Sequence, residues 1–250
     1  MKKTFRILTI LWMGSIATPL HAHPLEDSAV VYYDSGRFEE AAAFYDRLLA
    51  EEPQNPWLLY NRGNCAYKLG RIGEAIRYFL AAYRIRPLNE DIRHNLEMAL
   101  ARAPDEIPLP EPFFVFRWLG IIGSLLPIRT WWILALGTGA IAMTLMGIYA
   151  FGFQEVWRRW GFYGSLVAAG LSVLFFLPAF VHGQQLKQPL TVVVVPECEV
   201  SSEPSTTAPK LFVLHEGAVA HLRDSTASYF LIMIDSRRQG WVKRENVEIL

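Results

Sequence analysis

The chain is 250 residues long and carries 24 Lys and Arg against 24 Asp and Glu. This balance gives no basic excess of the kind that indicates nucleic-acid binding, and no acidic tail. Two cysteines do not make a disulfide framework. The sequence also lacks the nucleophile elbow, the paired-histidine zinc motif of metalloproteases, the phosphate loop and the dinucleotide fingerprint. We therefore expect no enzyme activity, no catalytic residues and no cofactor.

Residues 1–22 have the layout of a secretory signal peptide. Basic residues precede an apolar run from Ile7 to Ile16, and the segment ends with the small residue Ala22. We expect cleavage after Ala22. The alternative is a retained anchor with its basic end inside the cell, and in both cases the residues that follow lie outside the cytoplasm.

The following region repeats with a period of thirty-four residues. The recurring pairs are Gly36 and Gly70, Glu40 and Glu74, Ala41 and Ala75, Tyr45 and Phe79, and Pro53 and Pro87. This period, with Gly between two helices and Pro closing the unit, resembles the tetratricopeptide repeat. The resemblance implies units at 22–55 and 56–89, followed by a capping helix from Asp91 to Ala103.

The repeated residues carry specific structural expectations. Gly36 and Gly70 should end their helices in the left-handed conformation, and the repeated alanines should let paired helices pack closely. The segment Asn61–Asn64 resembles the packing segment of the family, whereas the first unit departs from it. Cys65 is expected to be a small buried hydrophobe.

Tetratricopeptide arrays bind peptides or partner proteins on the concave face that their first helices form. Carried onto this sequence, the resemblance implies that this face includes Tyr33, Trp57, Tyr60, Asn64, Tyr67, Lys68 and His94. The alternative is that the aromatic residues fill gaps between helices and that Lys68 is simply solvated.

Residues 104–130 connect the repeats to the apolar part of the chain. Prolines from Pro104 to Pro112 predict a stiff extended connector. The apolar, aromatic segment 113–126 contains Arg117 and ends before Pro127, which favours a helix lying in the membrane interface. If this segment crossed the membrane instead, the two soluble parts would lie on opposite sides.

Two uncharged apolar stretches, 131–153 and 161–181, are each long enough for a transmembrane helix. The short connection 154–160 predicts a hairpin with both outer ends on one side. Arg158 and Arg159 between two tryptophans indicate that the connection is cytoplasmic, so both soluble parts should face the periplasm from the inner membrane. The absence of ionisable residues favours an anchor over a conduit.

Small residues recur at helical spacing in both stretches, which would let the two helices approach closely. Ordinary tolerance of small residues in membrane helices is the alternative. The residues are Ala135, Gly139 and Ala142 in the first stretch, and Gly161, Ser165, Ala168 and Ser172 in the second.

Residues 190–250 read as short β-type runs separated by turns, which predicts a small all-β barrel. The order of Ser202-Glu203-Pro204, the segment 211–217 and Gly240-Trp241-Val242 is similar to bacterial SH3-like domains. In that family the Trp of the last motif packs in the barrel. The candidate partner-binding residues of this domain are Tyr229, Phe230 and Trp241, and one of the first two should face outward because strand residues alternate.

Two histidines of this domain, His215 and His221, invite a comparison with zinc sites. They lack nearby Cys or carboxylate ligands at recognised spacing and fall short of the three or four ligands that zinc uses. We therefore expect no metal. A disulfide between Cys65 and Cys198 would require the two soluble domains to dock.

The expected fold is thus multi-domain, with an all-α tetratricopeptide-repeat solenoid, two transmembrane helices and a small all-β SH3-like barrel. This order resembles the BatE-type family of Bacteroides-aerotolerance (Bat) proteins. The resemblance implies a role in aerotolerance or oxidative stress and partners with von Willebrand A-type domains. We hypothesise a membrane scaffold whose two tethered modules gather other membrane or periplasmic proteins. The alternative is a cell-wall sensor that binds peptidoglycan.

Overall fold

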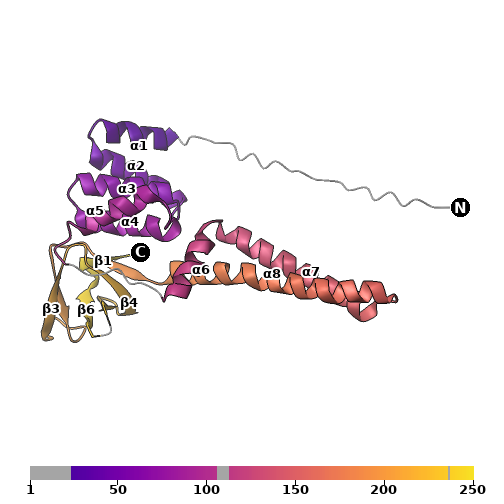
Figure 1. Ribbon diagram of the computed structural model, residues 1–250. Coiled ribbons are helices and arrows are strands. Elements are labelled where there is room, and N and C mark those ends of the chain that lie inside the picture. The colour runs from indigo at the N-terminus through magenta and orange to yellow at the C-terminus, as the bar shows by residue number, and fades with distance from the viewer. Residues whose placement is uncertain (1–23, 106–112, 236) are drawn as a thin grey trace.

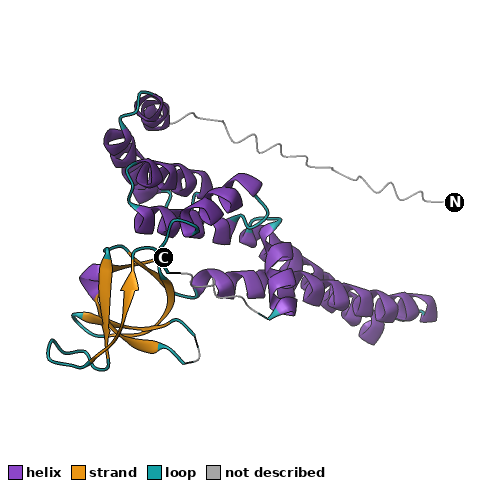
Figure 2. Ribbon diagram, turned by 60° about the vertical axis from the view of Figure 1, so that its left-hand side comes forward, coloured by secondary structure: helices purple, strands orange, loops and turns teal. Residues whose placement is uncertain are grey.

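The computed structural model describes residues 24–105, 113–235 and 237–250. The expected signal peptide and most of the proline-rich connector lie outside the described residues. The described chain forms a helical array, a long helical hairpin and a β domain (Figure 1). The strands lie together at one end of the molecule, beneath the helical array (Figure 2).

The helical array reproduces the repeat that the sequence predicts. Its helices are α1 (Pro24–Asp34), α2 (Phe38–Glu51), α3 (Pro56–Lys68), α4 (Ile72–Ile85) and α5 (Glu90–Leu100). Gly36 and Gly70 have φ of 77° and 80°. After the second of these glycines, the N–H of Arg71 donates to the carbonyl of Ala66, which is the hydrogen bond of a Schellman motif. The predicted left-handed glycines are therefore confirmed.

Small residues set the distance between paired helices, as the repeat predicts. Ala41 and Ala75 are fully buried. At Gly63, an added Cβ would lie 2.7 Å from ring carbons of Phe79, well inside van der Waals contact. The packing of α3 against α4 therefore requires a residue without a side chain at this position.

The buried Arg62 joins three helices of the array. Its Nε lies 2.8 Å from Asp46 Oδ1 on α2, and its Nη2 lies 3.3 Å from Glu74 Oε2 on α4. The guanidinium also stacks 4.7 Å from the ring centre of Tyr78. A buried charge is tolerated when it is paired in this way, so the expected packing segment contributes an ion-pair network as well as a close helix contact.

The hairpin consists of α7 (Ile128–Phe151) and α8 (Glu155–Lys187), which lie side by side along their length (Figure 1). Most of the expected connection 154–160 is helical, because α8 begins at Glu155. An acidic residue in the first turn favours this start, and Arg159 pairs with it one turn later. The arginine pair therefore lies on the first turns of α8, at the tip of the hairpin.

The small residues of the two stretches lie at the contact between α7 and α8. Ala135, Gly161, Ser165 and Ala168 are buried. The hydroxyl of Ser172 donates to the carbonyl of Ala135 across the contact, at 2.8 Å. Close approach of the two backbones thus explains the recurrence of small residues.

Helix α6 (Phe114–Ser124) folds back against the base of the hairpin. The side chain of Gln185 on α8 donates to the carbonyl of Phe116 at 2.9 Å, and the indole of Trp131 on α7 donates to the carbonyl of Gly123 at 2.9 Å. With 11 residues, α6 is about 16 Å long, roughly half the thickness of a hydrocarbon core. It is too short to cross a membrane.

The β domain is a seven-stranded antiparallel sheet. Its strands are β1 (Leu190–Val193), β2 (Glu197–Ser201), β3 (Lys210–His215), β4 (Val219–Ser225), β5 (Tyr229–Met233), β6 (Gln239–Lys243) and β7 (Val247–Ile249), and a 3-10 turn, η1 (Arg244–Asn246), precedes the last strand. The strand order is β3-β2-β6-β5-β4-β1-β7. No pairing of β3 with β7 closes the sheet in the described chain. The domain remains consistent with an SH3-like fold.

The sequence gives little sign of strand β2. Cys198 and Val200 point into the core, while Glu197 and Glu199 are exposed. This alternation is the signature of a strand with one buried face, but the run is short and half charged. The two glutamates conceal its β character in the sequence.

The helical array and the β domain share one hydrophobic core. Buried residues of α3, α4 and α5 form a single cluster with Leu190, Val192 and Val219 of the sheet. The main-chain N–H of Gly73 donates to Glu216 at 2.7 Å, and an added Cβ at this glycine would collide with the carbonyl of Val193. The two soluble modules are therefore docked as one unit, in addition to being tethered to the same hairpin.

Charged contacts surround this docking interface. Arg77 on α4 forms an ion pair with Glu248 on β7. The main-chain N–H of His215 donates to Asp105 at 2.7 Å, and its ring Nδ1 lies 2.9 Å from the other oxygen of that carboxylate. These contacts join α4 to β7, and the segment after α5 to β3.

Replacing Gly73 with Val should loosen the docked unit, because the new side chain would need the space of the Val193 carbonyl. Overpacking of this kind costs about 1–3 kcal/mol. Amide hydrogen exchange in β1, measured by mass spectrometry on the full chain, should accelerate about 10-fold or more. Ala43→Val, at an exposed position of α2, is the control and should leave β1 protected. Unchanged protection in Gly73→Val would contradict the docked arrangement.

Candidate functional site

Side chains of α3 and α5 form a hydrogen-bonded group on the face of the array where the sequence predicts partner binding. We call this surface the inner face. The side-chain amide of Asn95 donates to the hydroxyl of Tyr60 at 3.0 Å and to Asn64 Oδ1 at 2.8 Å. All three side chains are partly exposed. Tyr60 and Asn64 were expected here, whereas Asn95 was missed. Its signal was the repeat itself, because Asn95 follows Asn61 by one period of thirty-four residues.

Tyr33 extends this surface on α1. Its ring lies edge-on to Phe38, with 5.2 Å between ring centres. Burial raises the pKa of Tyr33, and the neighbouring Cys65 and Tyr60 raise it further. The phenol is therefore neutral at physiological pH and is able to donate a hydrogen bond to a ligand.

Tyr67 and Lys68 lie at the C-terminal end of α3. The guanidinium of Arg102 stacks 4.5 Å from the ring centre of Tyr67, which fixes the ring and adds a positive charge beside it. Lys68 is exposed. His94 is also exposed, and it precedes Asn95, which donates to Tyr60 and Asn64. These positions give the surface a mixture of aromatic, amide and cationic groups.

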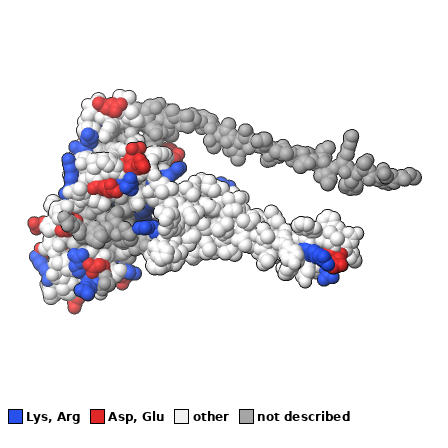
Figure 3. All heavy atoms as spheres, in the orientation of Figure 1, with Lys and Arg blue, Asp and Glu red and all other residues white. Residues whose placement is uncertain are grey.

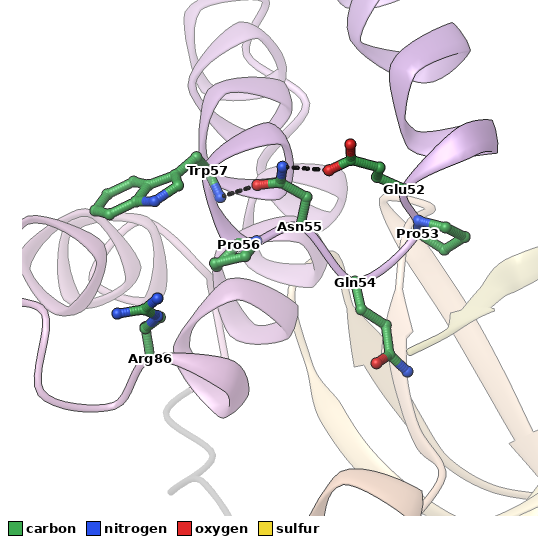
Figure 4. Close-up of a pocket in the computed structure, with 7 residues that line it drawn as sticks. All are labelled: Glu52, Pro53, Gln54, Asn55, Pro56, Trp57 and Arg86. Atoms are coloured by element: carbon green, nitrogen blue, oxygen red, sulfur yellow. Dashed lines mark hydrogen bonds between the residues drawn. The ribbon is translucent and has the colours of Figure 1, made fainter. Parts of the chain in front are cut away.

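Trp57 lies apart from this group, at the turn between α2 and α3. Its side chain is 44% exposed and borders a shallow hollow that includes Pro53 and Arg86 (Figure 4). Asn55 orders the turn, accepting from the N–H of Trp57 at 3.0 Å and donating to Glu52 at 2.7 Å. The indole extends over the side of the hollow where Arg86 lies.

The three candidates in the β domain separate onto two faces of the sheet. Phe230 is 4% exposed and belongs to the core, so it offers no surface to a partner. Tyr229 is half-buried on the outer face, as the predicted alternation requires. Trp241 also points outward, opposite Leu231, because Gly240 and Val242 take the buried positions of β6. The expected packing of this Trp inside the domain is therefore wrong.

The two histidines of the β domain lie where this domain meets the rest of the chain. His215 contacts Asp105 at the docking interface, and His221 lies on β4 at the junction with α4. Among the residues that the structure describes, no group of three or more His, Cys, Asp or Glu side chains could hold a metal ion.

Both cysteines are buried as free thiols, so the docking of the domains does not join them. Burial raises the pKa of the Cys65 thiol to about 11. Burial also raises the pKa of Cys198. Since the thiolate is the reactive form, neither cysteine presents a nucleophile to solvent at neutral pH.

The tetratricopeptide repeat family matches residues 26–90 of this chain. The match extends over both units that the sequence predicts and agrees with the helix pairs of the structure. The protein therefore contains tetratricopeptide repeats, a module that mediates interactions between proteins. No curated protein shows a significant match.

The buried thiols make a specific prediction. Because its pKa is about 11, Cys65 stays protonated at pH values where an ordinary thiol has already lost its proton. At pH 8 its thiolate population is lower than that of an ordinary thiol by about 100-fold. Alkylation of the native chain by iodoacetamide, followed by peptide mass spectrometry, should be at least about 100-fold slower at Cys65 than in denaturant. Rapid native alkylation would show that α3 does not pack as described.

Proposed function

We propose that the protein is a membrane-anchored scaffold that binds partner proteins on the inner face of its tetratricopeptide repeats. The observation that carries this proposal is the row of partly exposed Tyr33, Tyr60, Asn64 and Tyr67, with Lys68 at its end. Tyrosines supply large contact areas at low entropic cost and retain hydroxyls for hydrogen bonding. Such a surface suits an extended segment of a partner protein.

The apolar hairpin supports the membrane anchor. In the most apolar window of α7, only 6% of the residues are buried within the protein, whereas a core helix of a soluble protein would be mostly buried. Lys, Arg, Asp and Glu are missing from the visible face of the hairpin except at its tip and base (Figure 3). Exposure of so large an apolar surface to water is unfavourable, and a bilayer removes this cost.

The docked unit supports a topology with both soluble modules on one side. The contacts between α4 and the sheet can form only if the two modules share a compartment, and α6 is too short to separate them. Trp157 and Trp160 flank the two arginines at the tip, which favours a cytoplasmic tip. On this proposal the docked unit faces the periplasm from the inner membrane.

The partners follow from the family resemblance and remain part of this proposal. Other membrane or periplasmic proteins, including proteins with von Willebrand A-type domains in an aerotolerance complex, would bind to the docked unit. Because the modules form one body, a partner meets a single composite surface at a fixed distance from the membrane. Avidity between two freely tethered modules is not required.

Peptidoglycan binding is a second candidate, favoured by one observation. Tyr229 and Trp241 are partly exposed on the outer face of the sheet, where aromatic rings could stack on sugars. Trp241→Ala separates the two functions, since it would abolish co-sedimentation of the full chain with cell-wall material and leave capture of proteins by the repeats intact.

Substitution of Asn64 and Lys68 by Ala should weaken capture of partners by about 10-fold or more, as loss of interface hot spots does. Tagged full-length protein, cross-linked and purified from solubilised membranes, would be compared by quantitative mass spectrometry. Arg93→Ala removes an exposed cation of α5 and serves as the control. Equal recovery with all three proteins would reject the inner face as the binding surface.

Single added cysteines should report the topology against a low background, since both native thiols are buried. Arg237→Cys in the β domain and Lys68→Cys in the repeats should react with a membrane-impermeant maleimide in intact spheroplasts. Arg158→Cys at the tip should react only after lysis. Labelling of Arg158→Cys from outside, or of just one soluble module, would contradict the proposed arrangement.

A further inference from the structure

A cavity of about 610 Å³ lies where the repeats, the base of the hairpin and the β domain meet. Its walls come from α4, α6, the end of α8, β1 and β4. The proposed partner-binding surface does not use this space, and only Leu80 and Leu190 of its wall also belong to the docking core. It is large enough for the polar part of a small amphipathic molecule.

Positive charge converges on the cavity from three separate elements. Arg84 comes from α4, Arg117 from α6 and Arg223 from β4, and the histidines His182 and His221 also line it. No Asp or Glu contributes to the wall among the described residues. Blue Lys and Arg atoms are visible in the notch where the hairpin meets the soluble unit (Figure 3).

Arg84 is held in place without a carboxylate partner in the described chain. Its guanidinium donates to the main-chain carbonyl of Gln188 at 2.8 Å and to that of Gln185. These neutral acceptors position the cation but leave its net charge uncompensated. Arg223 has a similarly uncharged contact, the sulfur of Met233 at 3.5 Å.

The electrostatic effect of these arginines is visible at His221. Burial lowers the pKa of His221, and the positive charges of Arg223 and Arg84 lower it further. The imidazole is therefore neutral at physiological pH, as expected in a cavity that already holds excess positive charge. An anion is the ligand that such surroundings favour.

The cavity lies at the end of the apolar hairpin. His182 and Gln185 belong to the part of α8 that leaves the uncharged stretch, and α6 carries exposed aromatic side chains next to Arg117, among them Phe116 and Trp118. Exposed aromatic residues beside cations are typical of the level of lipid headgroups. Leu80, Ile121 and Leu190 add an apolar portion to the wall.

We propose that this cavity binds the phosphate-bearing headgroup of an anionic phospholipid. The guanidinium fork matches phosphate oxygens in geometry and charge, and the membrane level supplies the lipid in preference to a soluble anion. This inference rests on the proposed membrane insertion. Because the three arginines come from α4, α6 and β4, a bound headgroup joins the soluble unit to the hairpin base.

The test is selective lipid binding by the full chain. The purified protein is first shown to float with liposomes, and phosphatidylglycerol or phosphatidylcholine of matched acyl chains is then titrated and followed by native mass spectrometry. Arg223→Gln should weaken phosphatidylglycerol binding about fivefold, and the Arg117→Gln/Arg223→Gln double variant more strongly, as expected for loss of headgroup charge contacts. Arg93→Gln, which removes an exposed cation that does not line the cavity, should bind as the wild type does.

Several results would overturn the proposal. Equal affinity for the two lipids, or unchanged phosphatidylglycerol selectivity in the double variant, would remove the headgroup site. Displacement of the lipid by excess inorganic phosphate would assign the cavity to a soluble phosphoryl ligand instead. Failure to float with liposomes would reject membrane insertion and this inference together. Partner capture by the same variants is measured separately, so a failed lipid site and a failed scaffold are distinguishable.

Discussion

The contact between α4 and β1 is the interaction on which the arrangement of this protein depends. Val192 and Val219 complete a core that the repeats alone would leave open, and Gly73 lets the two backbones approach closely. Separation of the modules would expose this apolar surface to water, at about 25 cal/mol for each Å². The docking therefore constrains both modules to one compartment and fixes their common orientation.

This constraint changes how the inner face can work. The group of Tyr60, Asn64 and Asn95 belongs to helices whose opposite sides are packed on one another and on the sheet. Its side chains are consequently presented on a rigid support, with little entropy left to lose when a partner binds. In most repeat proteins, each unit is stabilised by packing against the next repeat. In this short array of two units, the β domain takes the place of that next repeat.

Local features of the fold could be predicted from the sequence, because they depend on residues close in the chain. Gly36 and Gly70 mark turns through backbone conformation alone, and the uncharged stretches mark the hairpin through length alone. Long-range features could not be predicted. The contact of Gly73 with β1 joins residues more than a hundred positions apart, and no periodicity encodes such a pair. Trp241 points outward because its neighbours face the core, a choice that depends on the register of the whole sheet.

The candidate site shows the same division. The repeat predicts Tyr60 and Asn64 on this face, and the structure places them together, whereas Asn95 required a comparison with Asn61 one unit earlier. Phe230 looked equivalent to Tyr229 in a list of aromatic residues, but strand alternation gives it to the core. The arginines of the cavity come from three elements that are distant in sequence, so only the folded chain brings them together.

The length of α8 has a mechanical consequence. Its 33 residues run without a break from the tip of the hairpin almost to β1, a span of about 50 Å. Arg84 on α4 donates to the carbonyls of Gln185 and Gln188 at the C-terminal end of this helix. On the proposed membrane insertion, a bilayer that tilts the hairpin would therefore also move the repeats that are bonded to the end of α8.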